Sequence, residues 1–301
     1  MPLWRLLLLT LYYHASSPWR RRKLSRAVTA GQVPVVILFY HRIADDRATP
    51  WTISNRMFAR HIHWLRERFE LISLDEAQRR IRAGANCRPC ASITFDDGYA
   101  DNCQQAIPLL VKERVPCTYF VTARNVLDGE PFSHDLIRGC PAVPNTLEQL
   151  QAMAAAGIEI GAHTYTHADL GQVTDRRLLR FEVVTAGRDL ASALGRPMRY
   201  FAFPYGQHVN LNREAFELAR EAGYEAVCSA YGGVNFPGDD PFHLQRIGAD
   251  DTMIRLKNRV TLDPRKMRIP RYIYGGPAQV AQPIQATTSA NATTGPVPVG
   301  H

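Results

Sequence analysis

Strand-like apolar segments alternate with helical segments along most of this chain, and this alternation constrains its fold more than any other feature. The clearest strand is residues 34–40, Pro-Val-Val-Ile-Leu-Phe-Tyr, because an unbroken apolar run is typical of a parallel strand buried on both faces. Further strands are predicted at residues 91–95, 117–122, 158–162, 199–203, 225–228 and 242–247. Strands separated by helices in this way predict an α/β fold with a parallel sheet, either open or closed into a barrel.

The helices are predicted from apolar residues that recur every three or four positions. In residues 55–69, Phe58, Ile62 and Leu65 fall on one face of such a helix. Other helices are predicted at residues 74–83, 100–114, 147–156, 175–194 and 213–222. Residues 124–146 are predicted to be a long loop beside a binding groove; within it, the pair at 134–135 (His-Asp) is interpreted as a turn, with a groove contact as the alternative.

The composition fits one large domain or two small ones. The chain has 301 residues, of which 46% are apolar, and this is enough for a full core. A net charge of +8 favours an anionic surface as a partner, whereas the lack of a basic run interleaved with aromatic residues argues against nucleic acid. The six cysteines form no disulfide framework, although a bridge between Cys87 and Cys90 is left open.

The first 30 residues form a separate apolar and basic segment. Residues 6–13 are apolar and residues 20–26 are strongly basic. The apolar stretch is too short to span a bilayer, and its positive charges follow it instead of preceding it as in a signal peptide. Two interpretations remain: residues 1–26 attach the protein to an anionic membrane surface, or the segment is a packed N-terminal helix.

The other end of the chain has a different composition. From Gly275 onward, Ala, Thr, Gln, Gly and Pro dominate, with almost no charge and few large apolar residues. Such a segment cannot bury a core, so residues 275–301 are predicted to be a disordered tail. The folded domain is therefore predicted to cover residues 34–274.

Two adjacent carboxylates, Asp96 and Asp97, follow the strand at 91–95 and precede a glycine. Because the chain turns where a strand ends, both side chains can face one pocket. Two anions so close are costly unless a cation or a shared proton relieves them. Taken alone, Asp-Asp-Gly after a strand is also typical of a turn that caps a helix.

Two histidines, His163 and His167, follow the strand predicted at 158–162. Histidines four positions apart are usually surface or core residues. Together with Asp97, however, they suit a borderline metal such as zinc, with coordination positions left for water and substrate. These residues also lie at the carboxyl ends of strands, where the active sites of parallel α/β folds are found.

A third segment, residues 201–206 (Phe-Ala-Phe-Pro-Tyr-Gly), again follows an apolar strand. In this order, Thr-Phe-Asp-Asp-Gly at 94–98, His-Thr-x-x-His at 163–167 and Pro-Tyr at 204–205 resemble the motifs of the polysaccharide deacetylase family, the family 4 carbohydrate esterases. The third motif is matched only in part. The resemblance covers roughly residues 34–250 and implies a distorted, incomplete (β/α)7 barrel.

The resemblance implies a role for each motif residue. Asp97, His163 and His167 would bind one divalent metal ion, for which zinc is favoured, and Asp96 would be the general base. The backbone N–H of Tyr205 would donate to the oxyanion that develops during the reaction. The residues implied in substrate contact are Thr164, Pro204 and Tyr205.

The sequence departs from the family at two places. Ala202 stands where the family usually has an arginine that pairs with the catalytic Asp, and residues 243–247 lack the Leu-x-His that usually supplies the general acid. Arg246 is the candidate replacement partner of Asp96, with a surface ion pair as the alternative. His41 is the candidate acid, because the Tyr-His-Arg around it resembles a family branch that acts on bacterial exopolysaccharide; the alternative is a structural hydrogen bond.

The expected activity is metal-dependent removal of acetyl groups from N-acetylated sugars of a polysaccharide or a glycolipid-linked glycan. Removal of O-acetyl or formyl groups by the same machinery is one alternative. A glycan-binding module with weakened catalysis is another, because the usual arginine and terminal histidine are missing. The resemblance favours the bacterial cell envelope or a membrane-associated location, with the cytoplasm as the alternative.

Overall fold

The computed structural model describes residues 2–263 and 269–275, and within them nine parallel strands form one curved sheet. The sheet contains β1 (Val35–Tyr40), β4 (Glu70–Leu71), β5 (Cys90–Phe95), β6 (Cys117–Val121), β7 (Glu159–Ala162), β8 (Tyr200–Ala202), β9 (Ala226–Cys228), β10 (His243–Leu244) and β11 (Ile247–Gly248). The order is β10-β9-β8-β7-β6-β5-β1-β11, and β4 also pairs with β5. A separate small sheet pairs β2 (Arg42–Ile43) with β3 (Thr52–Ile53).

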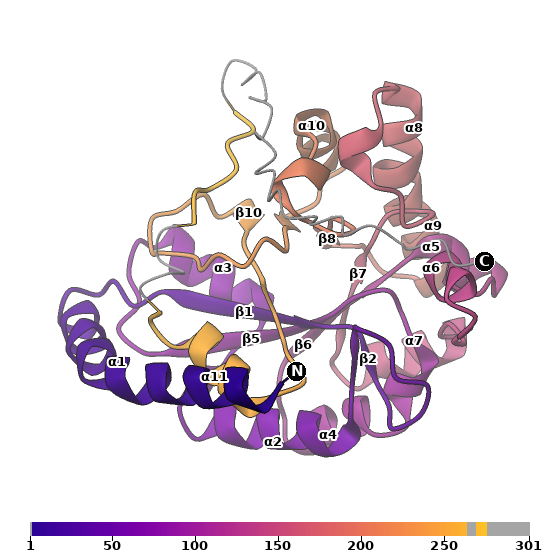
Figure 1. Ribbon diagram of the computed structural model, residues 1–301. Coiled ribbons are helices and arrows are strands. Elements are labelled where there is room, and N and C mark those ends of the chain that lie inside the picture. The colour runs from indigo at the N-terminus through magenta and orange to yellow at the C-terminus, as the bar shows by residue number, and fades with distance from the viewer. Residues whose placement is uncertain (1, 264–268, 276–301) are drawn as a thin grey trace, which may run out of the picture.

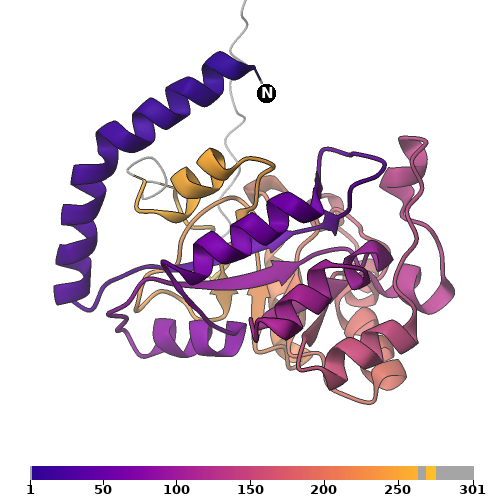
Figure 2. The same cartoon turned by 90° about the horizontal axis from the view of Figure 1, so that it is seen from below.

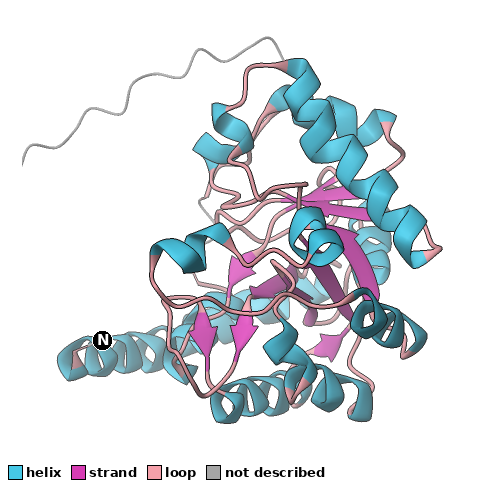
Figure 3. Ribbon diagram, turned by 90° about the vertical axis from the view of Figure 1, so that its right-hand side faces the viewer, coloured by secondary structure: helices cyan, strands magenta, loops and turns pink. Residues whose placement is uncertain are grey.

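Helices surround the strands on the outside of the curved sheet (Figures 1 and 3). They are α1 (Leu3–Thr29), α2 (Asn55–Arg66), α3 (Leu74–Arg82), η1 (Ala100–Cys103), α4 (Ala106–Lys112), α5 (Ala123–Asp128), α6 (Ser133–Ile137), α7 (Leu147–Ala155), η2 (Leu170–Gln172), α8 (Arg176–Arg180), η3 (Phe181–Thr185), α9 (Ala186–Leu194), η4 (His208–Asn210), α10 (Arg213–Glu221) and α11 (Met253–Val260). The arrangement confirms the predicted distorted, incomplete (β/α) barrel.

The helix at α2 shows how the sequence pattern produces this packing. The Ser54 side chain accepts a hydrogen bond from the Met57 N–H and so caps the helix, and Phe58, Ile62 and Leu65 are buried on its inner face. Burying each such side chain contributes about 1.5–3 kcal/mol to the free energy of unfolding. The predicted face of this helix is confirmed.

At one seam of the incomplete barrel, the chain itself joins the two ends of the sheet. The strands β10 and β11 lie at opposite ends of the sheet order, yet only Gln245 and Arg246 separate them in sequence. Asn235 joins the two sides: its amide donates to the Val35 and Gln245 carbonyls, and its oxygen accepts from the Gln245 N–H. The prediction of one strand at 242–247 is therefore wrong, because the chain crosses from β9 to β1 in the middle of that segment.

Three other predicted segments differ from the structure. The helix predicted at residues 100–114 is a 3-10 turn, η1, followed by the shorter helix α4. Residues 124–146 include two short helices, α5 and α6, instead of forming a plain loop. Helices of five or six residues are too short for an apolar period to show in the sequence. The predicted helix at 175–194 is interrupted by η3, a π-helical turn between α8 and α9.

The N-terminal segment is a long helix, α1, that packs along α11 (Figure 2). Arg20 is buried at this contact and donates to the Asn258 side chain and the Thr261 hydroxyl. Among the described residues, no helix combines the length and the apolar character needed to cross a membrane. The predicted tail lies outside the described residues apart from Gly275, and all six cysteines, including Cys87 and Cys90, are free.

Candidate active site

The motif residues meet at the carboxyl edge of the barrel. Asp96 and Asp97 follow β5, His163 follows β7, and the segment that contains Tyr205 follows β8. Backbone hydrogen bonds continue the strand pairing into these turns, from Asp96 N–H to the carbonyl at Tyr40 and from His163 N–H to the carbonyl at Val121. A pocket of about 190 Å³ results, lined by Phe39, His41, Trp51, Asp96, Asp97, His134, His163, His167, Phe203, Tyr205 and Ala230.

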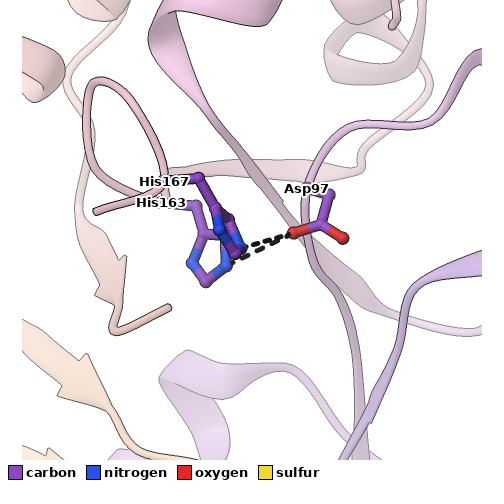
Figure 4. A group of neighbouring side chains, drawn as sticks. All are labelled: Asp97, His163 and His167. Carbon is purple, nitrogen blue, oxygen red and sulfur yellow. Dashed lines mark ion pairs between the residues drawn. The ribbon is translucent and has the colours of Figure 1, made fainter. Parts of the chain in front are cut away.

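Three of these side chains form a cluster with the geometry of a metal site. The Asp97 Oδ1 atom lies 3.5 Å from His163 Nε2 and 3.2 Å from His167 Nε2 (Figure 4). One ligand atom from each residue lies within 4.8 Å of the other two. One carboxylate and two imidazoles are a ligand set of catalytic zinc sites, in which a further position stays open for water or substrate. The structure thus brings together the three predicted ligands.

Two further observations fit a cation at this cluster. Asp97 Oδ1 is buried, and none of the described residues makes a regular hydrogen bond to it. His163 Nδ1 donates to the Ala202 carbonyl oxygen at 2.8 Å, which turns Nε2 toward Asp97. A ligating histidine is commonly oriented in this way by a partner on its other ring nitrogen.

The protonation of the cluster follows from burial and charge. Burial lowers the pKa of His163 to about 4, so this imidazole is neutral and ready to bind a metal. Burial also lowers the pKa of His167, but the nearby Asp97 carboxylate outweighs it, and the net pKa is raised. Burial raises the pKa of Asp97, yet His167 and the neighbouring histidines hold it well below the usual range. Asp97 is therefore an anion at neutral pH.

The backbone at the site is held in an unusual conformation. Asp97, Thr164, His167 and Tyr205 all have positive φ, between 60° and 75°. Asp tolerates the left-handed region, but for a β-branched residue such as Thr164 it is an outlier. Strained residues persist only where the surrounding structure holds them, and they cluster at functional sites.

Glu182 holds the loop that carries the two histidines. It is 2% exposed, and its carboxylate accepts hydrogen bonds from the Tyr165 N–H, the Thr166 N–H and the Thr166 hydroxyl. Three bonds to one carboxylate fix the two residues between Thr164 and His167. Glu182 lies in the π-helical turn η3, and π-helical turns often mark functional sites. Sequence reasoning missed this residue, because it lies outside every motif.

Arg246 pairs with Asp96, which Ala202 has no side chain to do. Its guanidinium donates to both oxygens of Asp96, at 2.6 and 2.8 Å, and also to the Thr94 hydroxyl and the Ser229 carbonyl. Its side chain is fully buried. The predicted contact with Asp96 is confirmed, and the alternative of a surface ion pair is wrong, because the pair lies inside the barrel.

The remaining predicted residues take different places. His41 and Tyr205 line the pocket, and the Tyr205 ring lies 5.2 Å from the ring of His167. The backbone at His41 is held by Asn102, whose amide donates to the His41 carbonyl. Thr164 is buried outside the pocket lining; its carbonyl accepts from the Ala123 N–H, and its hydroxyl has no partner among the described residues. Pro204 is likewise outside the lining.

His134 belongs to the pocket wall, which corrects its interpretation as a turn. Its Nε2 atom lies 2.8 Å from the Tyr99 hydroxyl and 3.9 Å from Asp97 Oδ2. Trp51 donates from its ring nitrogen to the same hydroxyl, and its ring packs edge-on against His134. Burial lowers the pKa of His134. His134 lies in a segment without any motif, so the sequence indicated a groove contact only as an alternative to a turn.

A second, more polar cavity adjoins the pocket. It measures about 260 Å³ and shares Phe39, His41 and Trp51 with the catalytic pocket. Its far side is formed by Asp250, Asp251 and other residues between β11 and α11. The two cavities together form a groove wider than a single acyl group needs.

Comparisons with known proteins agree with this geometry. Residues 83–227 match the polysaccharide deacetylase family. The chain is 25% identical over 213 residues to the Bacillus subtilis protein YxkH, covering 70% of each chain. It is 21% identical over 210 residues to the poly-beta-1,6-N-acetyl-D-glucosamine N-deacetylase of Staphylococcus aureus, covering 67% of this chain and 69% of that protein.

The fold is also that of solved deacetylase structures. IcaB from Ammonifex degensii superposes with a TM-score of 0.63 at 25% identity, over 75% of this chain and 97% of that one. The family match includes the two carboxylates, the two histidines and Tyr205, whereas His41 and Arg246 come from segments on either side of it. By its motifs, their geometry and these comparisons, the chain contains a polysaccharide deacetylase domain, to which residues 83–227 match.

Proposed function

We propose that this enzyme removes acetyl groups from N-acetylated sugar residues of a polysaccharide, using a divalent metal ion held by Asp97, His163 and His167. The observation that carries the proposal is that Asp96, whose carboxylate is held by the buried Arg246, lines the same pocket as this cluster. A bound dication supplies a Lewis acid that polarises the acyl carbonyl and makes water more acidic. Zinc is the ion that this ligand set favours.

The chain's own residues complete the hydrolysis. Asp96 takes a proton from the attacking water as the oxygen–carbon bond forms, and Arg246 holds its carboxylate in the orientation for this. The Tyr205 backbone N–H, in the left-handed turn after Phe203, donates to the acyl oxygen as negative charge develops there. His41 protonates the leaving nitrogen as the carbon–nitrogen bond breaks, so that acetate and a free amine leave.

Substrate contacts extend beyond the acyl group. Trp51 lies in the wall of both cavities, where an aromatic ring and nearby polar groups suit a sugar ring. This supports a polymer or an oligosaccharide as substrate, with neighbouring sugars in the adjoining cavity. Thr164 and Pro204 lie outside the pocket lining. They would affect substrate binding only indirectly, by shaping the turns that carry the lining residues.

The experiment uses the purified full chain loaded with zinc and measures acetate release from N-acetylglucosamine oligomers and O-acetylated sugars, and formate release from N-formylated sugars. Release from the N-acetylated oligomers at least tenfold faster than from the other two supports the proposal. Faster release from O-acetylated or formylated sugars would mean that the same active site removes O-acetyl or formyl groups instead. Binding of oligomers without any release would instead support a glycan-binding module.

A further inference from the structure

We propose that the outer face of α1 lies in the interface of an anionic membrane and holds the enzyme there without crossing the bilayer. This inference is independent of the proposed reaction. It takes up the membrane-anchor interpretation of the N-terminal segment and assigns it to particular side chains.

The apolar part of this face is a stripe of large exposed side chains. Leu3, Trp4, Leu7, Leu8 and Leu11 are 73%, 57%, 57%, 56% and 66% exposed. Their spacing of three and four positions puts them on one side of the helix. A stripe of five such residues is unusual on a soluble surface and marks an interaction site. We call this set the leucine stripe.

The opposite side of α1 is already occupied by the domain. The Asn258 amide donates to the Leu9 carbonyl, and the buried Arg20 guanidinium lies against α11. The helix cannot turn its leucine stripe inward without breaking these contacts. Figure 2 shows α1 running along the flank of the molecule with its N-terminal part extending past the body.

The charge of the same segment points to an anionic partner. Residues 2–30 contain six cationic side chains and no Asp or Glu. Arg21, Arg22, Lys23 and Arg26 are exposed on the C-terminal half of α1, directly after Trp19. Basic residues beside an apolar face with tryptophans suit the headgroup region of acidic lipids, where each Lys or Arg strengthens binding.

A cavity beneath the helix favours a lipid over a protein as the occupant. It measures about 340 Å³ and lies between α1, the start of β1 and the ends of α2 and α11. Its walls are largely apolar, with Tyr13, Leu24, Trp64 and Phe69 among them, whereas Arg21 also lines it and is exposed. An apolar space with an arginine beside it is suited to the end of an acyl chain below an anionic headgroup.

The test is cosedimentation of the full chain with vesicles of phosphatidylcholine alone and of phosphatidylcholine mixed with phosphatidylglycerol. Wild-type protein should bind the mixed vesicles at least tenfold more tightly, and added salt should weaken this binding. The double variant Leu7→Asp/Leu8→Asp should lose tenfold or more of this affinity. The matched control Leu178→Asp, on an exposed leucine of α8, should bind like wild type.

Other outcomes would overturn the proposal. Equal binding to both kinds of vesicle, absence of binding, or wild-type binding by the double variant would each contradict it. A wild-type protein that dimerises in solution through the leucine stripe, and ignores vesicles, would assign this face to a second copy of the chain. Because the substituted side chains are exposed, unchanged circular dichroism and unchanged acetate release should accompany the loss of vesicle binding.

Discussion

Arg246 reaches Asp96 from the seam where the barrel closes, and its guanidinium holds both carboxylate oxygens. Gln245 and Arg246 are the two residues that join β10 to β11, and this position places the Arg246 side chain inside the barrel. Ala202, on β8, has no side chain that could make this pair. The usual ion pair is thus kept by a residue from a different strand end.

Replacing Arg246 should harm both stability and turnover. Arg246→Met leaves the Asp96 charge buried without its partner, and we expect a loss of about 3–5 kcal/mol in the free energy of unfolding. The double variant Arg246→Met/Asp96→Asn removes that charge and should regain stability, though not activity. Denaturant unfolding measures the free energy of unfolding of both variants. Equal stability of Arg246→Met and wild type would show that the Asp96–Arg246 pair is not buried away from water.

The carboxylate of Glu182 should control metal affinity without touching the metal. Glu182→Gln removes the charge from the three hydrogen bonds that fix the histidine loop, and we expect zinc affinity to fall about 10- to 100-fold. Competition with a chromophoric chelator measures the affinity. Glu221→Gln, an exposed glutamate on α10, is the control and should bind zinc normally. Normal zinc affinity of Glu182→Gln would mean that the loop holds its shape alone.

The role of His41 can be separated from metal binding. His41→Ala should lower turnover of an amide substrate by about 10²- to 10⁴-fold, because the leaving nitrogen must be protonated. Zinc content should stay normal, since His41 is not one of the three predicted ligands. Turnover of an activated ester should fall much less, because its leaving group needs no proton. Near-normal turnover on the amide would make His41 structural and direct attention to His134.

Stability should fall as the pH drops below about 6.5. Burial lowers the pKa of His61 and His163 to about 4 and that of His243 to about 3. Below the unfolded pKa of about 6.5 the unfolded chain binds protons that the folded protein excludes, so unfolding becomes easier. Each histidine then costs about 1.4 kcal/mol at one pH unit below that value.

Two variants on α2 test this account. His61 is fully buried, whereas the side chain of His63 is 77% exposed. His61→Phe should make the loss in unfolding free energy between pH 7.5 and pH 5.5 smaller by about 1.4 kcal/mol, because the folded protein no longer keeps a proton off this residue. His63→Phe should leave the pH dependence as it is. Identical pH profiles for His61→Phe and wild type would contradict the assignment.

The sequence predicted the barrel and the metal cluster because both have local signals. Asp97, His163 and His167 lie in short motifs directly after strands, and parallel strands end at one edge. Arg246 was predicted from the lack of an arginine at Ala202, together with the position of the last strand. The burial of Arg246 was not predicted. It depends on β10 pairing with β9 and β11 pairing with β1, and a local sequence pattern does not show which strands pair.

Glu182 was not predicted at all, and His134 was considered a groove contact only as an alternative, for a different reason. Glu182 acts on backbone N–H groups 16 and 17 positions away, through a π-helical turn that resembles an ordinary helix in sequence. His134 lies on a five-residue helix, too short to show a period. Both reach the site through tertiary structure, so only the coordinates reveal them.

We propose that this one pocket divides the hydrolysis between the metal ligands, Asp97 among them, and a general base, Asp96. The most direct measurement compares zinc content and acetate release, on an N-acetylglucosamine oligomer, for wild type, Asp96→Asn and Asp97→Ala. We expect that Asp96→Asn keeps one zinc and loses at least 10²-fold in turnover, whereas Asp97→Ala loses both zinc and turnover. Wild-type turnover in Asp96→Asn, or a full complement of zinc in Asp97→Ala, would contradict it.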